Sequence, residues 1–304
     1  MMSINPVLPF NLTLASLLEK LRPMCWGAAD ILLAYSRREN PPYGFPSVLE
    51  VQEGSDGPVS VADLAVNTWL LEGLKSSFKQ EDWILLSEET VKKQLAVNKP
   101  VDSEWLWILD PLDGTKDFLE GSTDYAVHLA LVHFNRPVLG IVLIPELEEL
   151  WFGGLGVGTW CENRLGDRIS PSFSNRRLES DLLLVTSRSH RDLKLEKLLE
   201  RIPFLSGKKV GSVGCKVATL LRGEADIYIS LSGKTAPKDW DMAAPEAVLI
   251  AAGGGFTHVD GSTLEYNKGD WQQAGCLVAS HGFKHPQICK KIMDELRALD
   301  DCVG

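Results

Sequence analysis

The sequence predicts a layered α+β fold. Its 304 residues suffice for one large domain or for two packed halves with an ample core. Apolar residues at helical spacing come first and short strand-like runs follow, but the two do not alternate in strict βαβ order. We therefore expect layers of sheet and helix rather than a Rossmann sheet. The polar stretch 163–181 suggests a division into two halves, 1–170 and 171–304.

The first half is expected to open with helices. Apolar periodicity predicts one long helix or two over about 14–35, with Pro23 as the break or kink, and another helix over about 63–78. Strand-like runs and a glycine-rich hairpin follow, at 84–86, 106–109, 126–132, 138–144 and 150–161.

The second half mixes strands and helices. We expect strands over 182–187 and 225–231, and helices over 192–201, 214–223, 241–252 and 286–299.

Composition narrows the possible functions. A net charge of −10 argues against a broad electrostatic grip on nucleic acid, although bound cations can still recruit a small anion. The six cysteines show neither a CxxC pair nor metal-ligand spacing, which indicates a reducing compartment. Polar residues interrupt the most apolar stretch, 126–144, so we expect no membrane span. The expected protein is cytoplasmic and acts on a small molecule, with its oligomeric state open.

The turn Asp110-Pro111-Leu112-Asp113-Gly114-Thr115 carries the strongest local signal for chemistry. It follows an apolar run, so Asp110 is expected where a strand leaves the sheet. Two carboxylates three residues apart can converge on one point, with the Leu112 carbonyl between them, as a hard cation such as Mg²⁺ requires. The alternative is an ordinary Asp-Pro turn with solvated carboxylates.

Other acids occupy comparable positions. Glu88 and Glu89 follow a predicted strand, while Asp63 and Asp241 stand at the starts of predicted helices. Each can serve a structural purpose alone, because acids suit helix N-termini and solvated loops.

Four segments together resemble the metal-binding signatures of the inositol monophosphatase superfamily, in its order and spacing. They are VSVAD (59–63), SEE (87–89), WILDPLDGTKDF (107–118) and WDMAAPEAVLIAAGG (240–254). The resemblance runs from about residue 14 to the C-terminus. It implies a layered αβαβα fold and Li⁺-sensitive hydrolysis of phosphate monoesters with two or three Mg²⁺ ions.

The resemblance also implies roles for individual residues. Thr115 and Asp63 would orient and deprotonate the attacking water, and the metal ligands would be Glu88, Asp110, the Leu112 carbonyl, Asp113 and Asp241. Physical chemistry agrees, because crowded carboxylates repel one another unless cations offset their charge. Metal-assisted phosphoryl transfer to water also needs no Cys or Ser nucleophile.

Further details resemble the 3′(2′),5′-bisphosphate nucleotidase branch, which removes the 3′-phosphate of adenosine 3′,5′-bisphosphate (PAP), a by-product of sulfate activation and sulfotransfer. They are the KDF after DGT (116–118), TSRSH (186–190) and GCK (214–216). A second substrate phosphate would need a cation such as Lys216 away from the metals. The expected substrate contacts are Gly114, Thr115, Ser187, His190, Ser212, Gly214, Lys216 and Asp241.

Alternatives remain at this point. The same metal site would serve an inositol monophosphatase or a sugar-bisphosphatase, and the segments 187–190 and 214–216 discriminate because a polyol monophosphate needs no second anion site. A non-catalytic metal-binding regulator is disfavoured because the expected catalytic residues are present. The chain also departs from the pattern, since Glu50 and Glu53 stand where many relatives carry a Lys, which leaves open how that loop closes and how tightly the last metal is held.

Overall fold

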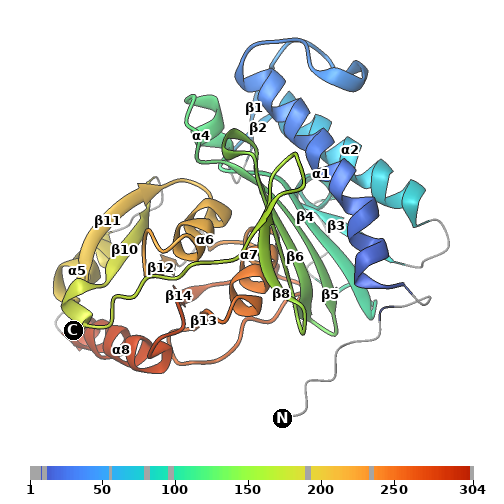
Figure 1. The fold of residues 1–304 in the computed structure, drawn as a ribbon. Helices are drawn as coiled ribbons and strands as arrows, with labels where there is room; N and C mark the ends of the chain where they lie inside the picture. Colours follow the sequence, from blue (N-terminus) through green and yellow to red (C-terminus); the bar gives the residue numbers. More distant parts are fainter. Residues whose placement is uncertain are drawn as a thin grey trace.

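The computed structural model describes residues 8, 12–54, 57–78, 83–94, 99–188, 193–232 and 236–301. The chain forms five layers, alternating helices with two sheets (Figure 1). The expected αβαβα arrangement is therefore confirmed. Within the described residues, no helix has the length and apolar character needed to cross a membrane.

Two helices form the outer layer on the larger sheet. The first, α1 (Leu14–Ser36), begins at the capping residue Thr13 and continues through Pro23, so the alternative of two helices was wrong. The second, α2 (Val61–Ser77), begins at Ser60. Their apolar faces bury one hydrophobic core against the sheet, which includes Leu21, Ile31, Val66, Leu70, Trp107 and Phe152.

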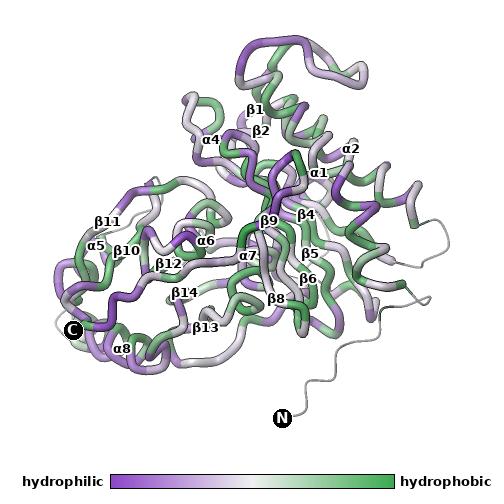
Figure 2. The backbone as a smooth tube through the Cα atoms, in the orientation of Figure 1, coloured by the Kyte–Doolittle hydropathy of each residue, from purple (hydrophilic) through white to green (hydrophobic). Residues whose placement is uncertain are grey.

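The larger sheet has seven strands and is antiparallel except for the first pair. In spatial order the strands are β3 (Ile84–Ser87), β4 (Trp105–Asp113), β5 (Ala126–His133), β6 (Arg136–Ile144), β7 (Glu149–Gly154), β8 (Gly158–Glu162) and β9 (Arg168–Ile169). Hydrophobic residues predominate along β5 and β6 near the centre of the sheet, where helices cover both faces (Figure 2).

The smaller sheet has five strands, and α5 (Leu193–Arg201) and α8 (His285–Asp301) cover its outer face. In spatial order the strands are β11 (Leu205–Val210), β10 (Leu183–Ser187), β12 (Ile227–Ser232), β14 (Gly275–Ser280) and β13 (Gly255–His258). The central strand β12 is parallel to β10 and antiparallel to β14.

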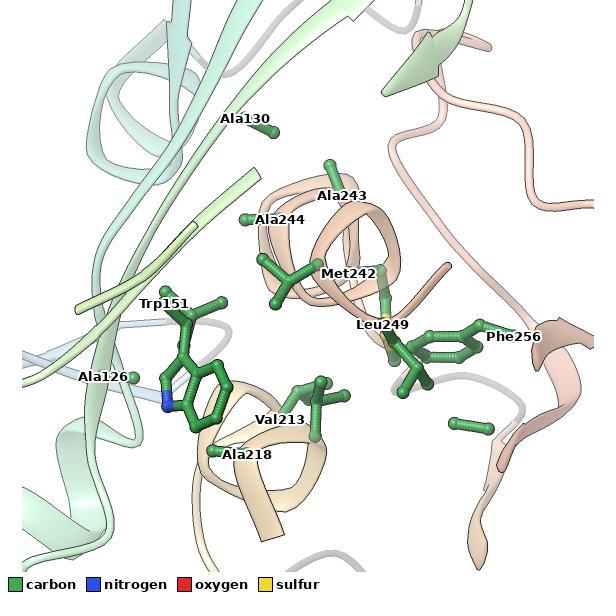
Figure 3. Packing of buried hydrophobic residues seen from close by; sticks show 14 of the residues in the cluster. Ala126, Ala130, Trp151, Val213, Ala218, Met242, Ala243, Ala244, Leu249 and Phe256 are labelled. Carbon is green, nitrogen blue, oxygen red and sulfur yellow. The ribbon is translucent and has the colours of Figure 1, made fainter. Parts of the chain in front are cut away.

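The middle layer contains α6 (Val213–Leu221) and α7 (Asp239–Ala251), which pack between the sheets. Figure 3 shows α7 with Ala243 and Ala244 near Ala130 of β5. Glycines in the sheet permit this close approach: a Cβ on Gly140 would lie 2.4 Å from the Ala244 carbonyl oxygen, and one on Gly153 would lie 2.4 Å from the Val248 Cα. The start of α7 is thereby brought to the larger sheet.

Short elements complete the fold: β1 (Val51–Gly54) and β2 (Gly57–Ser60), which pair as a hairpin, α3 (Glu88–Gln94) and α4 (Thr115–Leu119). The suggested division after residue 170 falls between β9 and β10. We retain this division as a proposal, noting that α7 of the later segment packs on the earlier segment's sheet.

Candidate active site

The site is built around three aspartates from two distant segments. Asp110 and Asp113 lie at the end of β4, and Asp241 lies in the first turn of α7. One carboxylate oxygen from each lies within 4.8 Å of the others. The strand reaches Asp113 instead of ending at Leu109, because β4 continues to pair with β5 across an irregularity between Asp110 and Asp113.

Backbone N–H groups at helix N-termini fix several of these acids. Asp113 Oδ2 accepts hydrogen bonds from Ser212 Oγ and from the Val213 N–H at the start of α6, both at 2.6 Å. Asp241 Oδ2 accepts the Lys238 N–H at the start of α7, at 2.7 Å. A helix N-terminus favours nearby negative charge, so each helix both holds and stabilises its carboxylate. The capping and site interpretations of these acids are therefore compatible.

The aspartates nevertheless repel one another. Burial, followed by the charges of Glu88, Asp113 and Asp241, raises the pKa of Asp110 well above its usual range. Burial and the charge of Asp113 raise the pKa of Asp241 to about 8. A cation placed among these oxygens would reverse the trend, because an opposite charge nearby favours the ionised form. Hard oxygen donors on a stiff frame suit Mg²⁺, so this donor set fits the expected ion.

Thr115 and Asp63 form a hydroxyl–carboxylate pair beside the cluster. Thr115 is the first residue of α4, and its Oγ1 lies 2.9 Å from Asp63 Oδ1 and 3.0 Å from the Leu112 carbonyl oxygen. The other oxygen of Asp63 accepts the Ser60 N–H at 2.7 Å, which holds the carboxylate at the start of α2. Burial raises the pKa of Asp63 to about 7. The pair can accept a proton near neutral pH.

Glu88 lies beside the three clustered aspartates but does not belong to the group whose carboxylate oxygens lie within 4.8 Å of one another. It opens α3, and its charge contributes to the raised pKa of Asp110. Lys92, one turn later, places its Nζ 2.7 Å from Glu88 Oε1 and 3.5 Å from Glu89 Oε1. Burial lowers the pKa of Lys92, but these carboxylates outweigh that effect and the net shift is upward. A cation that binds Glu88 must therefore compete with an ammonium group of this chain.

Gly114 shapes the turn between β4 and α4. Its φ of 92° lies in the left-handed region, which suits a residue without a side chain. A Cβ there would also lie 3.0 Å from the Asp124 carbonyl oxygen. The expected role of Gly114 toward substrate stays a prediction.

Three of the other expected substrate residues, Ser212, Gly214 and Lys216, already contact other parts of the protein. Ser212 binds Asp113, and Gly214 packs so closely on His128 that a Cβ would lie 2.3 Å from the ring. Lys216 is 2% exposed, and its Nζ donates to the Gly211 carbonyl and lies 5.2 Å from the centre of the Tyr228 ring. Ser187 ends β10, and His190 lies outside the described residues. Their roles toward substrate stay predictions.

The segment that departs from the resemblance is an exposed hairpin. Glu50 precedes β1 and Glu53 lies within it, and both are exposed. The Glu50 carbonyl accepts the Val61 N–H at 2.9 Å, which joins this segment to the start of α2.

Sequence reasoning missed two contacts of the site. The pairing of Lys92 with Glu88 follows from four-residue helical spacing, which could have revealed it. Arg188 pairs with Asp117 and Asp124, which lie far away in the sequence, and no local pattern signals that contact.

Comparisons with known proteins agree with this geometry. The sequence profile of the inositol monophosphatase family matches residues 17–297. The chain belongs to this family. The 3′(2′),5′-bisphosphate nucleotidase CysQ of Salmonella typhimurium is 34% identical over 213 residues, which cover 69% of this chain and 80% of that protein. As a family member, the chain is a phosphatase, and the acidic cluster agrees with metal dependence.

Solved structures of the family share the fold. An inositol monophosphatase of Thermotoga maritima superimposes with a TM-score of 0.71 at 21% identity, covering 94% of this chain and 99% of that one. An IMPase/NADP phosphatase complexed with Mg²⁺ and phosphate gives a TM-score of 0.70 at 20% identity, with 91% and 95% coverage.

Proposed function

We propose that this phosphatase is a Mg²⁺-dependent 3′(2′),5′-bisphosphate nucleotidase that converts PAP to AMP and phosphate in the cytoplasm. The observation that carries the proposed chemistry is the hydrogen bond of Thr115 to Asp63 beside the three clustered aspartates. The proposed substrate is supported by the identity with the Salmonella nucleotidase and by the match of the TSRSH and GCK segments.

The reaction transfers the phosphoryl group to water. The water oxygen forms a bond to phosphorus while the bond between phosphorus and the ribose 3′-oxygen breaks. Thr115 Oγ1 accepts a proton from the water as it gives its own to Asp63 Oδ1, at 2.9 Å. The departing ribose oxygen takes a proton from a second water molecule, and the hydroxide left behind takes the proton held by Asp63, which returns the site to its starting state.

The remaining residues of the site would bind the cation and keep its ligands in place. Glu88, Asp110, Asp113, Asp241 and the Leu112 carbonyl would hold Mg²⁺, with two or three ions expected from the family resemblance. When bound, the cation polarises the phosphoryl oxygens and offsets the negative charge that develops on them. The helix N-termini hold Asp113 and Asp241 ready for that purpose.

An inositol monophosphatase is the second candidate, and one observation favours it. Lys216 is buried on the Gly211 carbonyl, and Arg188 is paired with two carboxylates. Both cationic side chains therefore already bind groups of the protein itself. A substrate with a single phosphate would not need either of them for a second phosphate.

A substrate panel tests the proposal. We would measure kcat/KM for PAP, 3′-phosphoadenosine 5′-phosphosulfate (PAPS), inositol 1-phosphate and fructose 1,6-bisphosphate, with and without Mg²⁺ and with added Li⁺. We expect PAP to be preferred, with activity that requires Mg²⁺ and falls with Li⁺. A preference for inositol 1-phosphate would establish the second candidate instead, and activity unaffected by EDTA would overturn the metal assignment.

A further inference from the structure

Arg188 joins the smaller sheet to the loops of the larger one. It directly follows β10, and its N–H donates to the Val210 carbonyl at 3.2 Å. Its guanidinium pairs with the carboxylates of Asp117 and Asp124 and donates to Ser122 Oγ at 2.7 Å. The planar fork of an arginine suits such a contact, because its donors diverge in fixed directions.

The first of these carboxylates lies in a confined place. Asp117 is 4% exposed and stands two residues after Thr115 in α4. The backbone of Gly211 packs against it, and a Cβ on Gly211 would lie 2.6 Å from Asp117 Oδ2. A buried carboxylate requires a partner, which Arg188 supplies from the other sheet. Arg188 thereby holds the helix that carries Thr115.

Asp124, which carries the second carboxylate, is linked by hydrogen bonds to the expected metal site. The Asp124 carbonyl accepts the Ser212 N–H at 3.0 Å. Ser212 Oγ then donates to Asp113 Oδ2 at 2.6 Å. Arg188 is thus connected to one of the clustered aspartates through Asp124 and Ser212.

We propose that Arg188 is a positioning residue that holds Thr115 through Asp117 and Asp113 through Asp124 and Ser212. The guanidinium of Arg188 is engaged, because it pairs with two carboxylates of the protein. A guanidinium paired in this way is not free to bind a substrate phosphate. Arg188 therefore acts on catalysis and metal binding, and this inference rests on the proposed function.

The test compares Arg188→Gln and Arg188→Lys with the wild-type protein. The matched control is Arg201→Gln, since Arg201 pairs with Glu295 at 3.1 Å in the outer layer of the same sheet. The double variant Asp117→Asn/Arg188→Gln, compared with Asp117→Asn alone, removes the unpaired carboxylate that could unfold the single variant. Each protein is assayed for kcat and KM on PAP, for Mn²⁺ affinity by calorimetry and for its urea unfolding midpoint.

We expect Arg188→Gln to lower kcat about 10–100-fold and to weaken Mn²⁺ binding about tenfold, with KM changed less than about threefold. Arg188→Lys should recover part of kcat, and the double variant should recover stability but not kcat. An increase in KM alone would make Arg188 a substrate contact and overturn the proposal. So would unchanged kcat and Mn²⁺ affinity, or full recovery of kcat in the double variant.

The Mn²⁺ measurement separates this inference from the proposed function. If the wild-type protein does not hydrolyse PAP, the kinetic comparison moves to the preferred substrate of the panel. The predicted loss of Mn²⁺ affinity does not depend on that substrate, so its absence would overturn the role of Arg188 alone.

Discussion

Ser212 Oγ lies 2.6 Å from Asp113 Oδ2, which joins the N-cap of α6 to the end of β4 across 99 residues of sequence. The Val213 N–H binds the same oxygen. Ser212 was expected to contact substrate, and in the structure it holds a member of the acidic cluster. The middle layer therefore sets the orientation of an expected metal ligand.

Asp113→Asn should leave the fold intact and abolish turnover. The amide oxygen can still accept the hydrogen bonds of Ser212 and Val213, but the NH₂ group would then face the cluster and repel a cation. We expect kcat/KM with Mg²⁺ to fall by at least about 100-fold, with unfolding free energy within about 1 kcal/mol of wild type. The surface variant Asp300→Asn is the control, and near wild-type turnover in Asp113→Asn would contradict the metal assignment.

Thr115→Val should separate chemistry from metal binding. The substitution keeps the branched shape and removes the hydroxyl that lies 2.9 Å from Asp63. We expect kcat to fall about 100-fold or more, since proton transfer by a positioned group contributes about that much. Mg²⁺ affinity should change little. Thr115→Ser, which keeps the hydroxyl, is the control, and equal kcat in the two variants would exclude the proposed proton transfer.

Lys92→Met should strengthen divalent cation binding. The Lys92 ammonium lies 2.7 Å from Glu88 and competes with any cation that approaches this carboxylate. This ion pair joins two largely buried side chains one helical turn apart. If it contributes about 0.2–1 kcal/mol, the Mg²⁺ dissociation constant should fall up to about fivefold in calorimetry. Lys291→Met is the matched control, because Lys291 also pairs with a glutamate one turn away. Weaker binding would show instead that Lys92 holds Glu88 in place.

Asp63 should make the metal-free protein less stable as the pH rises. Burial raises its pKa from 3.8 to about 7, so between these values the folded state binds a proton that the unfolded state has lost. This stabilising contribution is complete below about pH 4 and is lost as the pH rises to about 7, by about 1.4 kcal/mol per pH unit.

Asp63→Asn should abolish that loss. In EDTA, we expect the unfolding free energy of the variant relative to wild type to increase by on the order of 2 kcal/mol between pH 5 and pH 8. Urea denaturation at each pH measures it, with Asp300→Asn as the control. Parallel pH profiles for wild type and Asp63→Asn would contradict the raised pKa.

Lys216→Met distinguishes two roles for this lysine. The sequence predicts a contact with a second phosphate, whereas the structure places Nζ on the Gly211 carbonyl beside Ser212. We expect a larger loss of kcat/KM on PAP than on inositol 1-phosphate, because only PAP carries a second phosphate that needs a cation. Equal losses on the two substrates would show instead that Lys216 supports only the Gly211 loop beside Asp113.

Most of the fold could be predicted because its central strands are apolar and bounded by polar turns. The run before Asp110 is one such strand. In contrast, β11 (Leu205–Val210), β13 (Gly255–His258) and β14 (Gly275–Ser280) were missed. The sequence LSGKKV of β11 lacks an apolar alternation. This strand lies at a sheet edge, where one neighbouring strand supports it and a partly polar sequence is tolerated.

The clustered acids could be assigned to the site because each lies in a short sequence motif that resembles a signature of the family. The contact of Arg188 with Asp117 spans 71 residues, and two charged residues so far apart carry no spacing pattern. Lys216 shows a different limit of prediction from sequence. A lysine in the first turn of a helix resembles a phosphate ligand in sequence, and only the packing of α6 places it in the core.

The shared middle layer has a consequence for biosynthesis. During translation the strands of the larger sheet are complete before α7 emerges, so the face around Gly140 and Gly153 stays open to solvent until then. Contacts between segments so far apart form slowly and leave partly assembled chains prone to aggregation. Because Asp241 lies on the helix that covers this face, the same helix both buries the apolar surface and completes the acidic cluster.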